Sequence, residues 1–229
     1  MKFFRQFLMP AGAIAFAAAL FLAAQFSVRL ITLPPGSFFQ RTSVMQTIYL
    51  VLCLTAMLLI SRSRLAEFGF TRGTFRFSPR ILWWLLPVAV FSILGAPASP
   101  HSHSFIDMTK TQTIVFIWLY SSFCEETLVR GLLQTLLSRS SEAGAVVRRG
   151  LSMPVVVSGL FFGAMHLTLI RLIGPGAIPI VLAATYLGLV AAYYREKTGS
   201  LLPAYILHVL FNIAGTLPMW LIPLLRAGR

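Results

Sequence analysis

Long apolar runs separated by short basic loops constrain the fold of this chain more than any other feature of its sequence. A helix needs about 20 mostly apolar residues to cross the hydrocarbon core of a bilayer. Runs of this kind lie at 8–28, 43–60, 81–97, 111–137, 151–170, 177–194 and 200–225. The sequence therefore predicts an all-α, polytopic membrane protein with about 7–8 transmembrane helices, the higher number applying if the last run splits at Pro218.

The composition supports a membrane protein. Of the 229 residues, 57% are hydrophobic and 11% are charged, and the mean hydropathy is +0.82. Soluble domains have about 25% charged residues. The net charge of +13 does not indicate a nucleic-acid partner, because the basic residues fall in short loops and not on one face of a soluble module. Cys53 and Cys124 lie in apolar runs, so we expect both to be buried free thiols.

The Lys and Arg residues of the loops predict the orientation, because cytoplasmic loops carry an excess of them. With the N-terminus inside, the inner loops contain Lys2, Arg5, Arg62, Arg64, Arg72, Arg76, Arg80, Arg139, Arg148, Arg149, Arg195 and Lys197, and the outer loops contain Arg29, Arg41, Lys110 and Arg171. We therefore expect a cytoplasmic N-terminus in the cell (inner or plasma) membrane. A signal peptide is the alternative for the first run, although that run exceeds the about 7–15 apolar residues usual there.

Residues 1–229 are predicted to form a single transmembrane domain, since no repeat, low-complexity tract or linker interrupts the pattern. The loop after the third run contains His101 and His103. A zinc site needs more convergent ligands than two histidines in a loop, so we expect these side chains to be solvated and to bind no metal.

Two adjacent carboxylates, Glu125 and Glu126, lie inside the fourth apolar run. A charged group in hydrocarbon is expensive unless it is paired, so an ionisable residue there is a hypothesis of function. The chain has only six acidic residues, and two of them are here. The polar residues that we single out inside the predicted spans form three clusters: Glu125, Glu126 and Arg130; His166; and His208 with Asn212.

Helical geometry separates the two glutamates. On an α-helix, Glu126 and Arg130 lie about 40° apart, whereas Glu125 and Arg130 lie about 140° apart. Arg130 is therefore the predicted partner of Glu126. The same spacing places His208 and Asn212 on one face, and Phe162 next to His166. Glu125, His166 and His208 come out about 21, 24 and 14 Å from the cytoplasmic helix ends, which permits a common site.

These residue types can activate water and stabilise an oxyanion. A carboxylate without a dedicated cation is a competent general base for water, which predicts that role for Glu125. His166 can hold or share that water, and His208 with Asn212 can present N–H donors to an oxyanion. Each residue also has a purely structural interpretation, as an ion pair or as a hydrogen bond between helices. Together, the three clusters favour one shared site.

Three motifs resemble those of a known family. EETLVR (Glu125 to Arg130) is similar to the Glu-Glu-x-x-x-Arg motif of the CPBP family, which comprises type II CAAX prenyl endopeptidases and bacteriocin-processing enzymes and is also called Abi. FGAMH (Phe162 to His166) resembles its Phe-x-x-x-His motif, and HVLFN (His208 to Asn212) resembles its His-x-x-x-Asn/Asp motif. The order also matches. The resemblance covers residues 111–215, which we expect to be the catalytic core, and leaves 1–110 as peripheral helices without an assigned role.

The resemblance implies an intramembrane glutamic endopeptidase, a hydrolase that acts on a peptide or on a membrane-anchored protein in the bilayer. It implies that Glu125 and His166 activate water, that His208 and Asn212 form the oxyanion hole, and that no metal or other cofactor is obligatory. Glu126, Arg130 and Phe162 are expected to support these groups.

Two other functions stay open at this point. A non-enzymatic binding or bacteriocin-immunity protein could share the fold, and a proton-coupled transporter would also contain Glu, Arg and His in its pathway. The transporter is disfavoured because no inverted repeat is visible. A zinc protease is disfavoured because no His-Glu-x-x-His motif occurs. Ser158 lacks the context of a nucleophile and is interpreted as a small residue at a helix interface.

Overall fold

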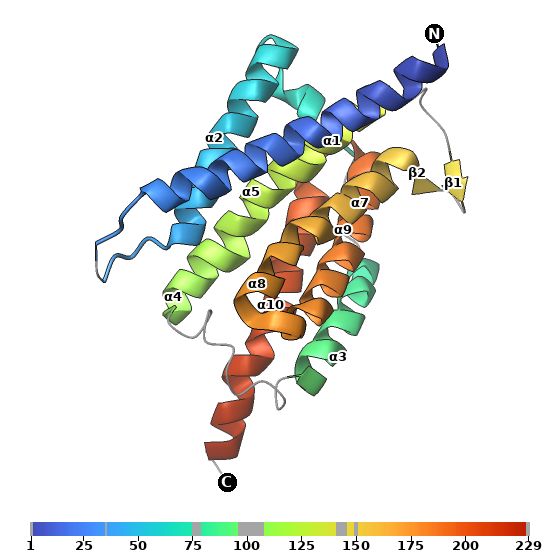
Figure 1. Ribbon diagram of the computed structural model, residues 1–229. Coiled ribbons are helices and arrows are strands. Elements are labelled where there is room, and N and C mark those ends of the chain that lie inside the picture. Colours follow the sequence, from blue (N-terminus) through green and yellow to red (C-terminus); the bar gives the residue numbers. More distant parts are fainter. Residues whose placement is uncertain are drawn as a thin grey trace.

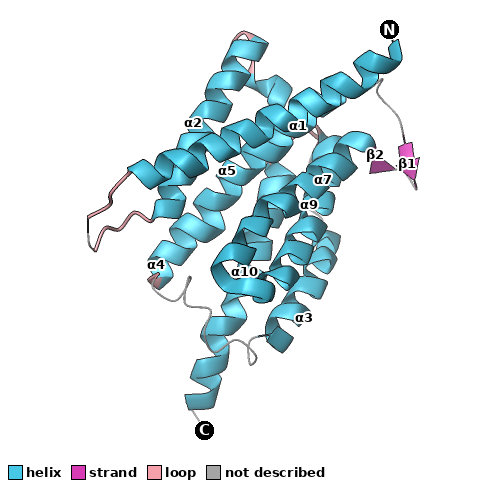
Figure 2. Ribbon diagram, in the orientation of Figure 1, coloured by secondary structure: helices cyan, strands magenta, loops and turns pink. Residues whose placement is uncertain are grey.

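The computed structural model describes residues 2–34, 36–74, 79–95, 108–140, 146–148 and 151–227. The loop that contains His101 and His103 lies outside these residues. The described part of the chain is almost entirely helical, apart from a short antiparallel pair formed by β1 (Val146–Arg148) and β2 (Leu151–Ser152) (Figure 2). The prediction of an all-α fold is therefore confirmed.

Helices before and after a central helix pack on its two sides (Figure 1). The N-terminal part contains α1 (Lys2–Ser27), η1 (Val28–Leu30), α2 (Arg41–Ser61), η2 (Leu65–Phe68), η3 (Pro79–Leu85) and α3 (Leu86–Gly95). The C-terminal part contains α7 (Met153–Met165), η7 (His166–Leu169), α8 (Ile170–Ile173), η8 (Gly174–Ala177), α9 (Ile178–Thr198) and α10 (Leu202–Ala227). In Figure 1, α1 crosses in front of α2 and of the central helix, and α3 lies against α10.

The central helix runs from Lys110 to Ser140 and contains two π-helical segments. It consists of α4 (Lys110–Gln112), η5 (Thr113–Ser121), α5 (Ser122–Glu126), η6 (Thr127–Leu133) and α6 (Gln134–Ser140), of which η5 and η6 are π-helical. The Thr109 side chain caps its start by accepting a hydrogen bond from the Gln112 amide. π-Helical turns are rare and frequently occur at functional sites. Here they flank the segment that contains both glutamates.

The core surrounds the central helix. All seven residues of η6, Thr127–Leu133, are buried, so neighbours cover this part of the helix on all sides. Cys53 and Cys124 are both buried and free, as the sequence predicted.

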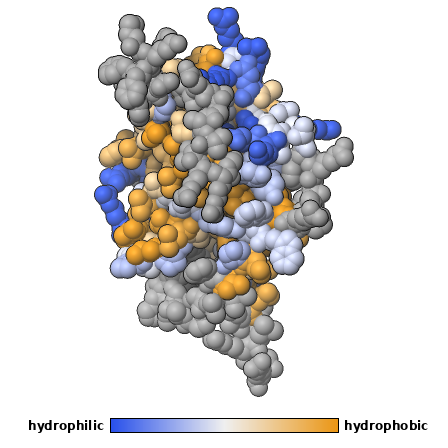
Figure 3. Space-filling view, turned by 90° about the vertical axis from the view of Figure 1, so that its right-hand side faces the viewer, coloured by the Kyte–Doolittle hydropathy of each residue, from blue (hydrophilic) through white to orange (hydrophobic). Residues whose placement is uncertain are grey.

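Apolar side chains cover the outside, whereas charges are buried at the centre. Leu59 is 77% exposed and Leu182 is 65% exposed, and apolar side chains cover a broad area of the face shown in Figure 3. By contrast, Arg130 is fully buried. A soluble protein rarely exposes large apolar patches. This distribution fits a protein whose outer surface faces lipid.

Among the described residues, three helical stretches are long and apolar enough to cross a membrane: Met9–Leu30, Arg41–Ser61 and Gly174–Thr198. Three shorter apolar helices, Ile81–Val90, Met153–Leu169 and Leu202–Pro218, correspond to other predicted spans. The remaining predicted span is the central helix, whose buried charges interrupt its apolar character. All predicted runs thus overlap helices, and α10 continues through Pro218 without splitting.

Glycines allow α7 and α9 to pack more closely than residues with a Cβ atom would. A Cβ atom on Gly188 would lie 2.6 Å from the Gly159 carbonyl oxygen, and one on Gly159 would lie 2.7 Å from Leu189 Cδ2. Small residues are the usual means by which membrane helices approach each other closely. This contact sets the position of Phe162, on α7, relative to the Gly188 carbonyl, on α9.

Candidate active site

Arg130 and Glu126 form a buried ion pair on the central helix. The Arg130 Nη1 atom donates to Glu126 Oε1 at 3.0 Å, and the side chains are 0% and 1% exposed. Arg130 Nη2 donates to the Gly188 carbonyl oxygen at 2.9 Å, and the guanidinium lies 4.4 Å from the centre of the Phe162 ring. The arginine expected beside Glu126 from the i, i+4 spacing is therefore present, and it also joins the central helix to α7 and α9.

His208 contacts both glutamates. Its Nδ1 atom lies 2.9 Å from Glu126 Oε1, and its Nε2 atom lies 3.8 Å from Glu125 Oε2. Because a carboxylate only accepts hydrogen bonds, Nδ1 is the protonated atom of this pair. Glu126 thus fixes the orientation of the imidazole and turns Nε2 toward Glu125.

The other oxygen of Glu125 is held from the opposite side. Ser121 Oγ donates to Glu125 Oε1 at 2.7 Å. The Gln46 amide, which comes from α2, donates to Ser121 Oγ at 2.5 Å and approaches Glu125 Oε1 at 3.4 Å. Oε1 is therefore occupied, and Oε2 is the oxygen on the side of His208.

Phe162 lies between the two histidines. Its ring centre is 4.9 Å from that of His166 and 5.3 Å from that of His208, which it meets edge to face. The His166 Nδ1 atom lies 2.9 Å from the Phe162 carbonyl oxygen. A carbonyl accepts only, so Nδ1 carries the proton and the Nε2 lone pair is available as a base. His166 is half-buried at the end of α7.

Asn212 fastens α10 to the central helix. Its Nδ2 atom donates to the Ile117 carbonyl oxygen and to Ser122 Oγ, both at 3.0 Å. Both amide hydrogens therefore have acceptors on the central helix in this structure. Asn212 therefore does not present free N–H donors to an oxyanion, as the sequence predicted. Instead it helps to position His208, which lies one turn away on α10.

The structure connects the residues predicted from the sequence, but not all directly. Glu125, Glu126, Arg130, Phe162 and His208 form a continuous set of contacts, which His166 joins through Phe162. Asn212 contacts Ser122 on the central helix. Sequence reasoning missed Gln46 and Ser121. The available signal for Gln46 was a glutamine inside the apolar run 43–60.

This arrangement places acid–base groups among buried side chains. Two carboxylates and an imidazole lie within hydrogen-bonding or short electrostatic range of each other, beside aromatic and aliphatic side chains. Within the described ranges, no group of three or more His, Cys, Asp and Glu side chains is placed to hold a metal ion.

The apolar outer surface and the buried carboxylate–imidazole network define an integral membrane protein with a polar site among its helices. Residues 107–214 match the family model described as type II CAAX prenyl endopeptidase Rce1-like. This segment makes up just under half of the chain and contains all three motifs, and the match supports the resemblance to the CAAX protease (CPBP) family. Comparison with curated proteins and with solved structures gave no match.

Proposed function

We propose that the protein is an intramembrane endopeptidase that hydrolyses a peptide bond in a membrane-anchored peptide or protein, with Glu125 as the general base. One observation carries the proposal most directly: His208 bridges the two glutamates, with Nδ1 on Glu126 and Nε2 facing Glu125 Oε2. The match of residues 107–214 to the type II CAAX prenyl endopeptidase family model supports this proposal.

Glu125 takes the proton of the attacking water. With Oε1 held by Ser121, the Oε2 lone pair is the free basic site. As the water oxygen bonds to the substrate carbonyl carbon, one water proton passes to Glu125 and the carbonyl oxygen becomes an oxyanion. The C–N bond then breaks, the oxyanion returns to a carbonyl, and Glu125 delivers its proton to the departing amine. His166 positions the water through its Nε2 lone pair.

His208 stabilises the oxyanion. When protonated, its Nε2–H points toward the reaction centre while the Glu126 carboxylate accepts the hydrogen bond from Nδ1. Asn212, which the family resemblance assigns to the oxyanion hole, would have to release Ser122 Oγ to donate there, and otherwise acts by holding α10 in place. No step requires a metal or other cofactor. We further propose that the protein lies in the cell membrane with its N-terminus in the cytoplasm.

Three variants test the proposal: Glu125→Gln, His166→Ala and His208→Ala. We expect each to abolish cleavage while the protein stays folded in the membrane. Mass spectrometry of membrane-anchored peptides would show uncleaved precursors in the variant cells that are processed in wild-type cells, which also identifies the substrate. Glu67→Gln is a matched control, because Glu67 is a partly exposed carboxylate that pairs with Arg64 and Arg139 away from this site.

Full retained function in all three variants would instead favour a binding or immunity protein. A chelator separates the metal-free mechanism from a metalloprotease. Lasting inhibition by the chelator that zinc reverses would contradict the mechanism proposed above.

A further inference from the structure

A polar pocket lies at the C-terminal end of the central helix, away from the candidate active site. It has a volume of about 470 Å³ and lies between the ends of the central helix and of α9 and the short helix η2. The residues that matter for its chemistry are Glu67, Thr135, Arg139, Arg195 and Glu196. Thr135 follows Glu125 by ten residues, which is a rise of roughly 15 Å along a helix. The pocket is therefore separate from the carboxylate–imidazole network.

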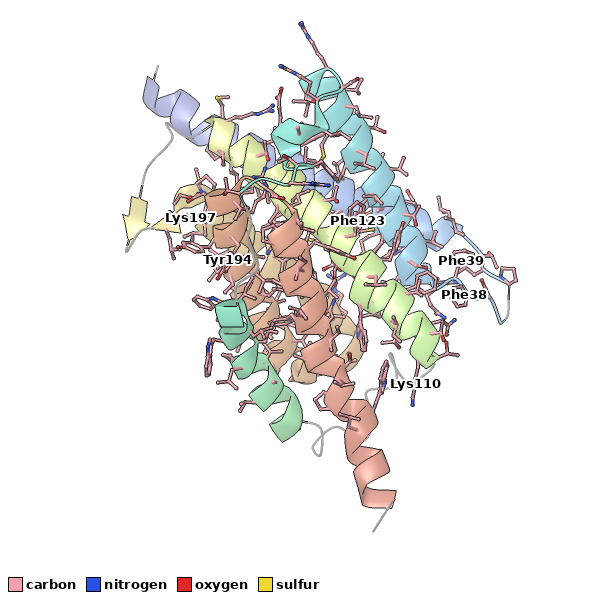
Figure 4. All side chains as sticks on the ribbon, turned by 180° about the vertical axis from the view of Figure 1, so that it is seen from behind. Phe38, Phe39, Lys110, Phe123, Tyr194 and Lys197 are labelled. Carbon is pink, nitrogen blue, oxygen red and sulfur yellow. The ribbon has the colours of Figure 1, made fainter. Side chains whose placement is uncertain are left out.

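The end of α9 beside this pocket has the composition of a membrane–water interface. Tyr193 is 36% exposed, and Lys197 Nζ lies 5.5 Å from the centre of its ring. Figure 4 shows Tyr194 and Lys197 in the last turns of α9. Tyrosine is enriched at the level of the lipid headgroups, and basic residues follow where the chain leaves the bilayer. Arg195, in the same turn, therefore lies at the depth of the lipid phosphates.

Arg195 brings a cation to the pocket that no carboxylate neutralises. Its side chain is half-buried and forms no ion pair among the described residues. Nη2 donates to Thr135 Oγ1 at 3.4 Å, and Nε is buried next to Gly69, where a Cβ atom would lie 2.6 Å away. Nη1 has no acceptor in the described part of the chain and, unlike Nε, is not buried. The guanidinium is thus held in place with accessible donors for a ligand.

The two carboxylates of the pocket differ in what they contact. Glu67 Oε1 lies 2.8 Å from Arg64 Nε, and Oε2 lies 2.6 Å from Arg139 Nη2, so two arginines neutralise this carboxylate. Glu196 is exposed, and its Oε2 atom accepts from the Ser152 hydroxyl. Its Oε1 atom has no partner among the described residues. The pocket therefore offers one free carboxylate oxygen beside the free guanidinium.

We propose that this pocket binds the phosphoethanolamine headgroup of a phospholipid. Arg195 and the remaining N–H groups of Arg139 donate to the phosphate oxygens, and the ammonium group donates to Glu196 Oε1. Arginine N–H groups match phosphate oxygens in geometry, and basic pockets at the ends of membrane helices are a recognised type of headgroup site. The volume is within the about 300–1,000 Å³ of small-molecule pockets. The inference goes beyond the proposed protease function and does not depend on it.

The test compares lipids that have the same acyl chains and different headgroups. Purified protein in detergent is titrated with dioctanoyl phosphatidylethanolamine, phosphatidylcholine or phosphatidylglycerol, and native mass spectrometry measures the bound fraction. We expect wild-type protein to bind phosphatidylethanolamine about threefold or more tightly than the other two lipids. Only its headgroup combines a phosphate with N–H donors for Glu196.

Two variants separate the phosphate contact from the ammonium contact. Arg195→Gln should weaken phosphatidylethanolamine binding about tenfold or more, because it removes a charge-assisted hydrogen bond to the phosphate. Glu196→Gln should weaken it about threefold, to the level of phosphatidylcholine, without weakening the binding of the other two lipids. Because Glu196 is exposed, this variant keeps the test valid if Arg195→Gln fails to fold.

Lys197→Gln is the matched control, since it removes a positive charge from the same end of α9 but Lys197 does not line the pocket. It should leave the binding of all three lipids unchanged. Equal losses in Lys197→Gln and Arg195→Gln would show attraction by the overall surface charge and overturn the pocket assignment. Equal binding of the three lipids by wild-type protein, or unchanged phosphatidylethanolamine binding in Arg195→Gln and Glu196→Gln, overturns the proposal.

Soluble competitors distinguish a lipid from a free phosphate compound. Phosphoethanolamine and inorganic phosphate lack acyl chains, so we expect them to displace the lipid only at about tenfold or higher concentration. Displacement at equal concentration would identify a soluble phosphate compound as the ligand and overturn the assignment to a lipid. None of these assays measures peptide cleavage, so their outcome is separate from that of the proposed function.

Discussion

Glu126 Oε1 lies 2.9 Å from His208 Nδ1 and 3.0 Å from Arg130 Nη1, so a single carboxylate oxygen fixes both the histidine and the buried cation. Among the described residues, the adjacent Glu125 pairs with no arginine, and its Oε1 atom accepts from neutral donors, Ser121 and Gln46. Two neighbouring carboxylates therefore have different surroundings. Glu126 holds Arg130 and His208 in place, whereas the Oε2 atom of Glu125 faces His208 Nε2 at 3.8 Å.

The first prediction concerns the buried ion pair. Arg130→Ala leaves the Glu126 carboxylate buried without its cation, which should destabilise the protein by about 3–5 kcal/mol. Arg139→Ala is the control, because Arg139 pairs with Glu67 while 38% exposed, and such surface pairs contribute about 0–1 kcal/mol. Thermal unfolding in detergent compares the two. Equal losses of stability in the two variants would show that the buried Arg130 pair contributes no more to the free energy of unfolding than the exposed Arg139 pair.

The second prediction assigns a role to the peripheral α2. Gln46→Leu and Ser121→Ala each remove a donor from the network that holds Glu125 Oε1, so the carboxylate should lose its fixed orientation. We expect kcat to fall about 10–100-fold with KM little changed, since second-layer partners of catalytic groups typically have effects of that size. Cleavage assays of the substrate identified by mass spectrometry provide the measurement.

Tyr120→Phe is the matched control for these variants. It removes another hydrogen bond between α2 and the central helix, from the exposed pair of Tyr120 and Thr47. If Tyr120→Phe lowers kcat as much as Ser121→Ala, the effect comes from helix packing and not from the orientation of Glu125.

The sequence predicted the helical class, the Glu126–Arg130 pair and the separation of the two glutamates, because these depend on local spacing and on apolar length. It could not predict that Gln46 reaches Glu125, since that contact joins residues 79 positions apart and depends on how α2 packs. It also predicted that Asn212 presents N–H donors to an oxyanion, whereas its Nδ2 atom donates to the Ile117 carbonyl oxygen and to Ser122 Oγ on the central helix. A motif fixes which residues share a helix face, whereas the acceptors on the facing helix come from tertiary packing.

The π-helical segments are a further feature that spacing did not predict. The 100° step used for the central helix applies to α-helix, yet η5 and η6 are wound more loosely. Glu126 and Arg130 still pair across the boundary between α5 and η6.

The third prediction concerns the contact between α7 and α9. In Gly188→Ala the new methyl group would lie 2.6 Å from the Gly159 carbonyl oxygen, so the helices must separate. Overpacking of this kind costs about 1–3 kcal/mol. It also moves the Gly188 carbonyl that accepts from Arg130, so activity should fall with stability. Thermal unfolding and cleavage assays measure both.

Gly12→Ala on α1 provides the comparison, because a Cβ atom there meets nothing within 4 Å. In a helix this change should be neutral or stabilising by up to about 1 kcal/mol. Gly188→Ala protein as stable as Gly12→Ala protein would mean that α7 and α9 do not need their close approach.

The last prediction tests orientation with single cysteines. Cys53 and Cys124 are buried, so a membrane-impermeant maleimide should label neither in the folded protein, and the native cysteines need not be removed. Thr32 and Arg72 are exposed in the loops that precede and follow α2 and η2. With a cytoplasmic N-terminus, Thr32→Cys lies outside and should react in intact cells, whereas Arg72→Cys should react only after permeabilisation. The opposite pattern would reverse the orientation, and reaction of both in intact cells would mean that α2 does not cross the membrane.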